Sequence, residues 1–326
     1  MSQKISAITG AFSYTGRYVT QILQQQGVQV RNLTNHPSRP VPKNQINKDQ
    51  IDVYPLNYDD VNSLSKSLEG ADTLYCTYWV RFNDYKGTTR EQGIQRAKNI
   101  IQAAKNVGIQ KIIYTSHTQS SLESPFAYIN GKAQMEEYIK ESGISYGFAK
   151  PCMIFGDTPQ ESIVANNCAY LLRKLPIFLI PGQGNYPVQP VHVRDMAQLM
   201  VKMAEDKNQN QDFDAVGPEI FTYNEFIQLI QDATNSKVLK IKGLNTDVVH
   251  KMITPVEYLL KDKFIEKDDL DLLTNNYLHS KQPPTGSIKF SEWVYQNREQ
   301  LGKRYINSTD LYYTGETTIF DKVQKI

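Results

Sequence analysis

The stretch ITGAFSYTGRYVTQILQQQG, residues 8–27, decides the fold. An apolar strand over residues 4–10 runs into a glycine-containing turn, and a helix with one apolar face follows. A helix N-terminus offers unpaired backbone N–H groups and the positive end of the helix dipole, so it attracts phosphate. Gly10 and Gly16 let the backbone approach a ligand closely, and Ser13 stands midway, where a third glycine is usual. We interpret this turn as a pyrophosphate-binding loop in which one glycine is replaced.

Strand-like and helix-like segments alternate along the first half of the chain. Short apolar segments are typical of strands, and segments with one apolar face are typical of helices. Asp60 is a suitable N-cap residue for one of these helices. This alternation predicts an α/β fold of Rossmann type, a doubly wound parallel sheet with the first strand near its centre. The expected strands cover residues 4–10, 28–34, 50–56, 71–79, 111–116 and 144–150, and two of the expected helices cover about 90–106 and 127–143.

The alternation ends after residue 151. Residues 159–185 hold a helix and a proline-bounded apolar segment, and residues 219–326 are mostly helical and more polar. We therefore expect a nucleotide-binding Rossmann domain of residues 1–158, to which residues 186–218 return. Residues 159–185 and 219–326 should form a smaller, mainly helical C-terminal lobe that carries the substrate site.

The composition excludes several classes of function. The chain has 326 residues and a net charge of +2, which gives no electrostatic case for nucleic acid or an anionic membrane. Its longest apolar run, residues 175–180, is far too short to span a bilayer, and no signal-peptide core follows the N-terminus. Three cysteines and five histidines lack metal-ligand spacing. We expect a cytoplasmic protein that acts on a small molecule without a metal. The oligomeric state stays open, with a homodimer as one alternative.

Several segments together resemble one known family. The turn TGAFSYTGR is similar to that of extended and atypical short-chain dehydrogenase/reductases, the NAD(P)-dependent epimerase/dehydratase and NmrA-like group. The similarity covers about residues 4–235, with Lys150 where the family usually has arginine. Residues 269–280 resemble the branch that contains the NADPH-binding accessory subunit of respiratory complex I. The further segments that resemble the family are GADTLY (70–75), VGIQKIIYTS (107–116), KPCMIFG (150–156), VHVRDMAQLM (191–200) and FDAVGPEIFTYNEF (213–226).

The end of the second expected strand bears on the choice of cofactor. An NAD site usually has Asp or Glu there to hold the ribose 2′-OH, but NLTNHPSRP has no acid. Arg17 and Arg39 suit the 2′-phosphate of NADP(H), although Arg39 could also be a plain surface charge. We expect NADP(H) to be preferred, with NAD(H) as the alternative. In the family pattern Asn57 and Tyr58 border the adenine. The expected cofactor-binding residues are Gly10, Ala11, Phe12, Ser13, Tyr14, Thr15, Gly16, Arg17, Asn35, Arg39, Asn57, Tyr58, Thr77, Tyr78, Lys132 and Pro151.

The resemblance also implies a catalytic Tyr-x-x-x-Lys pair on one helix face. The lysine charge lowers the tyrosine pKa and can hold the nicotinamide ribose. Only Tyr128 and Lys132 lie at the start of the helix that follows the fifth expected strand, so we assign the roles of acid/base and partner to them. The same spacing occurs by chance in Tyr146/Lys150, Tyr170/Lys174 and Tyr277/Lys281.

The third catalytic position of the family, a Ser or Thr, falls on His117. Three alternatives remain open. Ser116 or Thr118 could serve after a small shift of the loop, His117 could donate a hydrogen bond instead, or the site could be degenerate. His192, in the Val-His-Val segment, is better explained as a structural residue.

The substrate pocket is the least predictable part. Tyr78, Trp79 and Phe82 could stack on the nicotinamide or line an apolar pocket, and core packing explains them equally well. Gln189 is a candidate polar contact. The leading hypothesis is an NADP(H)-dependent oxidoreductase or epimerase-like enzyme acting on a carbonyl or alcohol. The alternative is a regulator or assembly subunit that binds NADP(H) without turnover.

Overall fold

The chain forms two compact units in a computed structural model. The first unit consists of residues 1–151 and 196–214, and the second of residues 152–195 and 215–326. The residues that the structure describes are 4–42, 44–82, 87–263 and 265–308.

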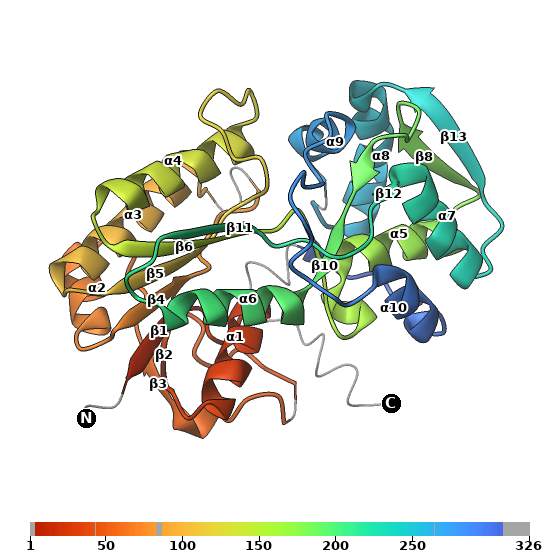
Figure 1. Cartoon of the computed structure of the whole chain (residues 1–326). Coiled ribbons are helices and arrows are strands. Elements are labelled where there is room, and N and C mark those ends of the chain that lie inside the picture. Colours follow the sequence, from red (N-terminus) through yellow and green to blue (C-terminus); the bar gives the residue numbers. More distant parts are fainter. Residues whose placement is uncertain (1–3, 43, 83–86, 264, 309–326) are drawn as a thin grey trace. The chain divides into compact units, whose positions relative to one another are not determined.

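A seven-stranded sheet forms the centre of the first unit (Figure 1). All neighbouring strands are parallel, and the order β11-β6-β5-β4-β1-β2-β3 places β1 between β2 and β4. The predicted Rossmann-type sheet with an inner first strand is confirmed. The strands are β1 Ile5–Thr9, β2 Gln29–Leu33, β3 Ile51–Tyr54, β4 Thr73–Cys76, β5 Lys111–Thr115, β6 Ser145–Lys150 and β11 Gln211–Asp214.

The seventh strand, β11, was not among the six that we expected. Its sequence, QDFD, has two aspartates and a single large apolar residue, so it lacks the apolar pattern of a buried strand. Parallel pairing with β6 holds it at the edge of the sheet, where Lys150 on β6 forms an ion pair with Asp212 at 2.7 Å. Tertiary pairing thus decides its structure.

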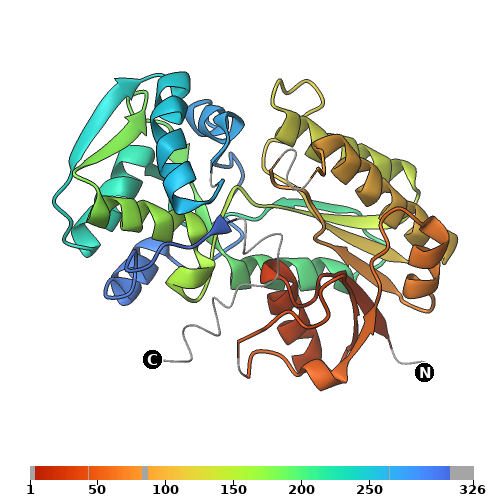
Figure 2. The same cartoon turned by 180° about the vertical axis from the view of Figure 1, so that it is seen from behind.

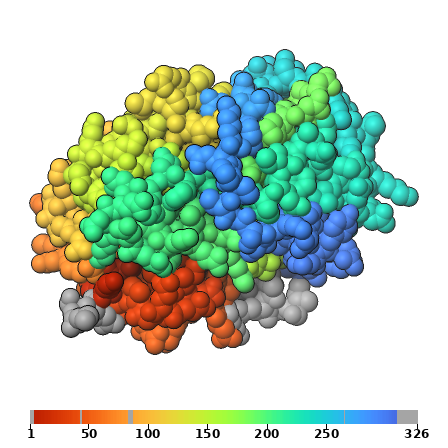
Figure 3. Space-filling model, viewed as in Figure 1, coloured from red at the N-terminus to blue at the C-terminus, as the bar shows by residue number. Residues whose placement is uncertain are grey.

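Helices cover both faces of this sheet (Figures 1 and 2). On one face, α2 (Val61–Leu68), α3 (Arg90–Asn106) and α4 (Ala127–Glu141) bury apolar side chains against the strands. On the other lie α1 (Tyr14–Gln25) and α6 (Val193–Glu205). Side chains of α4 and α6 form much of the surface of this unit in the view of Figure 3.

The second unit is mainly helical, as predicted, but it also contains three strand pairs that we did not predict. Its core includes the stacked rings of Phe226 and Phe290. The helices are α5 Ile163–Lys174, α7 Tyr223–Ala233, α8 Thr246–Leu260, α9 Lys267–Thr274 and α10 Phe290–Asn297. The pairs are β7 Met153–Phe155 with β10 Pro190–His192, β9 Pro187–Val188 with β12 Phe221–Thr222, and β8 Ile177–Pro181 with β13 Leu239–Leu244.

The unit boundaries lie near the domain boundaries that we expected, without coinciding with them. We expected residues 152–158, 186–195 and 215–218 in the Rossmann domain, whereas they belong to the second unit, in which β7 pairs with β10. No helix in the described part of the chain has the length and apolar character needed to cross a bilayer.

Candidate functional site

The turn after β1 is built around Gly10. Gly10 has φ +78°, a conformation that side-chain-bearing residues rarely adopt. Its N–H donates to the Leu33 carbonyl at 2.9 Å, and its own carbonyl accepts from the N–H of Ser13 at 2.8 Å. The chain therefore reverses tightly at the carboxyl end of β1 and enters α1 with the N-terminus of that helix at this edge of the sheet.

Gly16 is required because α1 packs directly on this turn. A Cβ at Gly16 would lie 2.0 Å from the carbonyl oxygen of Gly10 and 3.0 Å from Oγ of Ser13. Ser13 is the N-cap residue of α1, and its side chain makes no capping hydrogen bond. Its Oγ would lie 3.1 Å from a Cβ on Gly10 and 3.0 Å from one on Gly16, so the hydroxyl occupies the middle of the turn. Ala11 is buried, and its N–H donates to Oδ1 of Asn32 at 2.8 Å.

Two arginines come together next to the turn. Nε of Arg17 donates to Oε1 of Gln45 at 2.9 Å, and the Arg17 guanidinium lies 5.4 Å from the centroid of the Tyr14 ring. Burial and the nearby Arg17 charge lower the pKa of Arg39. Lys48 donates to the Arg39 carbonyl at 3.1 Å and holds that residue's backbone. Two like charges that destabilise one another favour an anion beside them.

The remaining turn residues differ in exposure. Phe12 is buried under the Lys48 ammonium, 4.5 Å from its ring centroid, whereas Tyr14 and Thr15 are half-buried at the start of α1. We did not predict a role for Lys48 or Gln45, because both lie in the loop between β2 and β3, Gln45 in a turn and Lys48 at the start of the short 3-10 helix Lys48–Gln50. Their importance depends on how that loop folds back on α1.

Tyrosine rings line the region where the family pattern places the adenine. The rings of Tyr58 and Tyr78 lie 4.7 Å apart, and burial raises the pKa of Tyr58. The amide of Asn35 donates to the Leu56 carbonyl at 2.9 Å, whereas Asn57 is exposed. Arg96, which we did not predict, lies 5.4 Å from the Tyr58 ring centroid.

Thr77 and Pro151 stabilise the carboxyl ends of the strands. The hydroxyl of Thr77 donates to the Thr9 carbonyl at 2.6 Å, and its N–H donates to Oγ1 of Thr9 at 2.9 Å. These bonds join the ends of β1 and β4. The Pro151 carbonyl, just after β6, accepts from the N–H of Thr118 at 3.3 Å. Both residues lie at the edge where ligands bind in such sheets.

Tyr128 and Lys132 share a face of α4 near the end of β5. The ring of Tyr128 meets that of His117 at 5.6 Å and that of Trp79 at 5.7 Å, both edge to face. Nζ of Lys132 donates to the Thr115 carbonyl at 2.8 Å and lies 5.9 Å from the centroid of the Tyr128 ring. Burial lowers the pKa of Lys132 to about 7.

Ser116 is turned towards a buried carboxylate. Its hydroxyl donates to Oε1 of Glu136, which also accepts from Ser120 at 2.6 Å, and Oε2 of Glu136 pairs with Lys150 at 3.0 Å. Glu136 was missed in the sequence. The available signal was its position four residues after Lys132, which places both on one helix face.

His117 is arranged as an acceptor. Its Nδ1 lies 2.6 Å from the Thr118 carbonyl, and since a carbonyl oxygen only accepts, Nδ1 carries the hydrogen. Burial lowers the pKa of His117 to about 4, so the ring is neutral at physiological pH and Nε2 is unprotonated. The idea that His117 donates in place of the family's serine finds no support in this geometry. Thr118 is fully buried.

Two residues from the second unit have structural roles. The Gln189 amide donates to the Gly217 carbonyl at 2.8 Å and accepts from the N–H of Ser280 at 3.0 Å. The amide nitrogen and the amide oxygen of Gln189 both have hydrogen-bond partners within the second unit, which argues against the substrate contact that we expected. Nδ1 of His192 accepts from the N–H of Arg194 at 3.1 Å, and Nε2 lies 3.4 Å from Asp157. This geometry agrees with the structural role that we expected for His192.

The competing Tyr-x-x-x-Lys pairs are placed elsewhere. Tyr146 lies in β6 and stacks on Phe148, with 4.4 Å between the ring centroids. Tyr170 lies in α5 of the second unit, next to Tyr305.

Phe82, a candidate for the pocket wall, is fully buried beneath Arg81.

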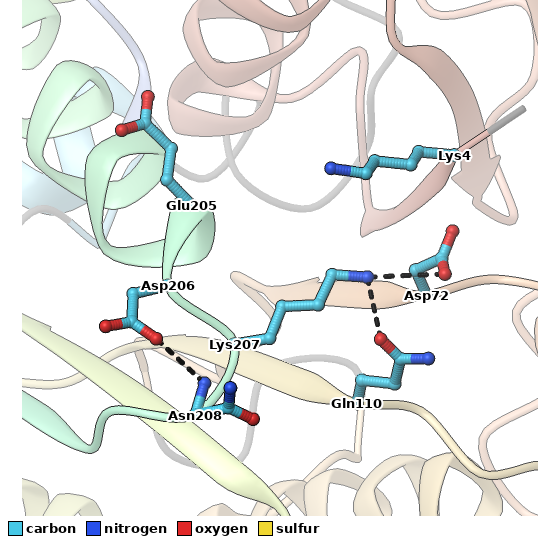
Figure 4. A pocket seen from close by; sticks show the side chains of 7 residues that line it. All are labelled: Lys4, Asp72, Gln110, Glu205, Asp206, Lys207 and Asn208. Atoms are coloured by element: carbon cyan, nitrogen blue, oxygen red, sulfur yellow. Dashed lines mark hydrogen bonds and ion pairs between the residues drawn. The ribbon is translucent and has the colours of Figure 1, made fainter.

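A hollow at the amino-terminal edge of the sheet is a different feature (Figure 4). Lys207 spans it, with an ion pair to Asp72 at 3.3 Å and a hydrogen bond to Gln110 at 2.9 Å. These contacts join the loop after α6 to the starts of the strands. The hollow lies at the edge opposite the glycine turn, so it is no part of the candidate site. Its lining consists of Lys4, Asp72, Gln110, Glu205, Asp206, Lys207 and Asn208.

Comparison with known proteins agrees with this geometry. A sequence profile of the NmrA-like family matches residues 1–270. The chain belongs to the NmrA-like family. Its fold is that of the NAD(P)-dependent reductases and epimerases of the extended short-chain dehydrogenase/reductase type, as the sequence predicted.

Curated relatives include proteins named as a subunit of NADH dehydrogenase [ubiquinone]. NADH dehydrogenase [ubiquinone] 1 alpha subcomplex subunit 9 of Dictyostelium discoideum is 23% identical over 275 residues, covering 82% of this chain and 74% of the relative. The protein of the same name in Arabidopsis thaliana is 22% identical over 302 residues, covering 88% and 73%. Both names include the word mitochondrial.

Solved structures share the fold at low identity. Triphenylmethane reductase of Citrobacter sp., complexed with NADP(H), has a TM-score of 0.71 at 18% identity, covering 90% of this chain and 99% of the reductase. The NADPH-dependent quinone oxidoreductase QOR2 of Escherichia coli, complexed with NADPH, has a TM-score of 0.63 at 18% identity, covering 95% and 98%.

Proposed function

We propose that this NmrA-like protein is an NADP(H)-dependent reductase that acts on a small carbonyl or quinone-like substrate. The observation that carries the proposal is the pairing of Tyr128 with Lys132 on α4, at the same edge of the sheet as the glycine turn. The NADP(H) and NADPH complexes of the two similar reductases support the choice of cofactor. Epimerase-like chemistry on the same pair of residues is the variant of this proposal.

The residues of the turn fit a dinucleotide. The N-terminus of α1 would hold the pyrophosphate through backbone N–H groups, because Gly10 and Gly16 leave no side chain in the way. Arg17 and Arg39 would hold the 2′-phosphate, which offsets the repulsion between their charges. When bound, the nicotinamide supplies or accepts the hydride.

Tyr128 would transfer a proton to or from the substrate oxygen. The charge on Lys132, when present, favours the ionised form of the tyrosine and eases this transfer. Trp79 and His117 fix the position of the Tyr128 ring. The neutral His117 adds no charge to the site.

Two measurements test this function. NADPH should bind at least about tenfold more tightly than NADH, a difference of about 1.4 kcal/mol, by calorimetric titration. The protein should also oxidise NADPH in the presence of some members of a panel of aldehydes, ketones and quinones. Equal or reversed affinities would contradict the cofactor assignment.

The second candidate is a regulator or assembly subunit that binds NADP(H) without turnover. The observation in its favour is that Glu136 holds the Ser116 hydroxyl while His117 offers only an acceptor, so neither of these two residues supplies the family's usual hydroxyl donor. The names of the curated relatives, which are subunits of a larger enzyme, support it too. NADPH binding without oxidation across the whole panel would favour this candidate.

We also propose that the protein is located in the cytoplasm. The three cysteines, Cys76, Cys152 and Cys168, all lie in the described part of the chain and form no disulfide there, which suits a reducing compartment. Microscopy of the tagged protein in its own cells tests this location. Signal confined to mitochondria would contradict it.

A further inference from the structure

The indole of Trp79 contacts both members of the Tyr128–Lys132 pair. Nζ of Lys132 lies 4.0 Å from the centroid of the Trp79 ring, and the same indole meets the Tyr128 ring edge to face at 5.7 Å. A cation at this distance from an indole face is attracted by the ring quadrupole. The lysine therefore has the indole on one side and the Thr115 carbonyl, at 2.8 Å, as its hydrogen-bond acceptor.

Gly131 leaves the space that the indole fills. A Cβ at Gly131 would lie 3.1 Å from Cη2 of Trp79 and 3.0 Å from Cδ1 of Ile94. Both distances are tighter than ordinary contact, so a larger residue would displace a neighbour. Since Ile94 lies on α3 and Gly131 on α4, the indole rests in a slot between these helices.

We propose that Trp79 is a positioning residue that acts through Lys132. Its indole covers the ammonium and keeps the lysine turned towards β5, where Nζ donates to the Thr115 carbonyl. The inference rests on the proposed function, but its first test needs neither cofactor nor turnover. Lys132 is only 2% exposed, which is consistent with this cover.

The charge of Lys132 can be followed separately from that of its neighbours. The pKa of Lys132 is lowered to about 7 by burial, that of His117 is lowered to about 4, and that of Cys76 is raised to about 11. Of these three groups, only Lys132 changes charge between about pH 6 and pH 8. The titratable groups that face Lys132 are Cys76 on β4, Tyr114 on β5, His117 in the loop after β5, and Tyr128 and Glu136 on α4.

Trp79 fluorescence reports this charge directly. The chain has two tryptophans, so Trp293→Phe leaves Trp79 as the single indole. Trp293 packs on Phe290 in the second unit, and its Nε1 has no hydrogen-bond partner among the described residues, so phenylalanine loses no bond there. Without cofactor, the emission of this variant should change sigmoidally with pH, with a midpoint near the pKa of about 7 that burial gives Lys132.

Two substitutions at Lys132 provide matched controls in the Trp293→Phe background. Lys132→Met removes the charge and should give the high-pH spectrum at every pH. Lys132→Arg keeps the charge and should give the low-pH spectrum throughout. Emission that does not titrate, or that titrates equally in Lys132→Met, would overturn the proposal.

Gly131→Ala tests the slot. The added methyl group should displace the indole, admit water to the ammonium, and raise the midpoint by about one pH unit or more towards the ordinary lysine pKa of about 10.4. An unchanged midpoint would show that the indole does not govern the lysine.

NADPH binding by the wild-type protein separates the failure of this inference from the failure of the proposed function. If wild-type protein binds no NADPH at all while the fluorescence titrates as expected, the proposed function fails and the Trp79–Lys132 contact stands.

Discussion

The glycine turn and the start of α4 lie at the same edge of one sheet, yet different forces hold them. The turn is determined by its own backbone, since Gly10 needs a positive φ and Gly16 has no room for a Cβ. The start of α4 depends on side chains from distant segments, because Trp79 and His117 pack on the Tyr128 ring. Changes in the turn should therefore act on cofactor binding, and changes near α4 on turnover.

The largest effect is expected from Gly16→Ala. A Cβ 2.0 Å from the Gly10 carbonyl forces α1 away from the turn and misaligns the N–H groups that would hold the pyrophosphate. Hydrogen bonds to charged groups contribute roughly 1.5–3 kcal/mol each, so NADPH affinity should fall by more than about a hundredfold in calorimetry.

Ser13 supplies the matched control for the turn. Ser13→Gly restores the usual small residue without filling space and should leave NADPH affinity nearly unchanged, whereas Ser13→Leu should abolish binding by steric exclusion. A folded Ser13→Leu protein with normal affinity would show that the turn does not bind the pyrophosphate.

Tyr128→Phe should have the next largest effect, and on turnover alone. The change removes the proton-transferring hydroxyl and leaves the ring contacts with Trp79 and His117 in place. General acid–base catalysis contributes roughly 10²–10⁴-fold, so NADPH oxidation should slow by about that factor with cofactor affinity almost unchanged. A Tyr128→Phe protein as active as wild type would exclude the assigned role.

Arg39→Ala should have a smaller effect that is specific to one cofactor. Losing one charge-assisted contact with the 2′-phosphate should weaken NADPH binding by about tenfold, or about 1.4 kcal/mol. NADH lacks this phosphate, so its affinity is the internal control and should not change. Parallel losses for both cofactors in calorimetry would mean that Arg39 supports the loop instead of the phosphate.

Ser116→Ala should have the smallest effect on turnover. Because Glu136 holds the Ser116 hydroxyl, the rate of NADPH oxidation should stay within about twofold of wild type. Stability should fall by roughly 1.5–3 kcal/mol in denaturant unfolding, since a buried carboxylate loses one donor but keeps Ser120 and Lys150. A tenfold loss of turnover would instead place Ser116 at the substrate.

The difference between features set by the local backbone and features set by distant side chains explains how much the sequence could predict. The strands, the turn and the cap Asp60 depend on local patterns, and the structure agrees with them, including the hydrogen bond from the N–H of Ser63 to Asp60 at 3.0 Å. The edge strand β11 escaped prediction because pairing with β6, and not its own sequence, makes it a strand. The roles of Glu136 and Trp79 depend on contacts between distant segments of the chain. The only local sequence signal for them is the i, i+4 spacing of Lys132 and Glu136.

A structure with NADPH bound tests the central claim most directly. The account predicts the pyrophosphate at the N-terminus of α1 beside Gly10 and Gly16, and the 2′-phosphate in contact with Arg17 or Arg39. It also predicts the nicotinamide ring beside the Tyr128 hydroxyl. NADPH bound away from the glycine turn, or a nicotinamide ring that lies out of reach of Tyr128, would contradict it.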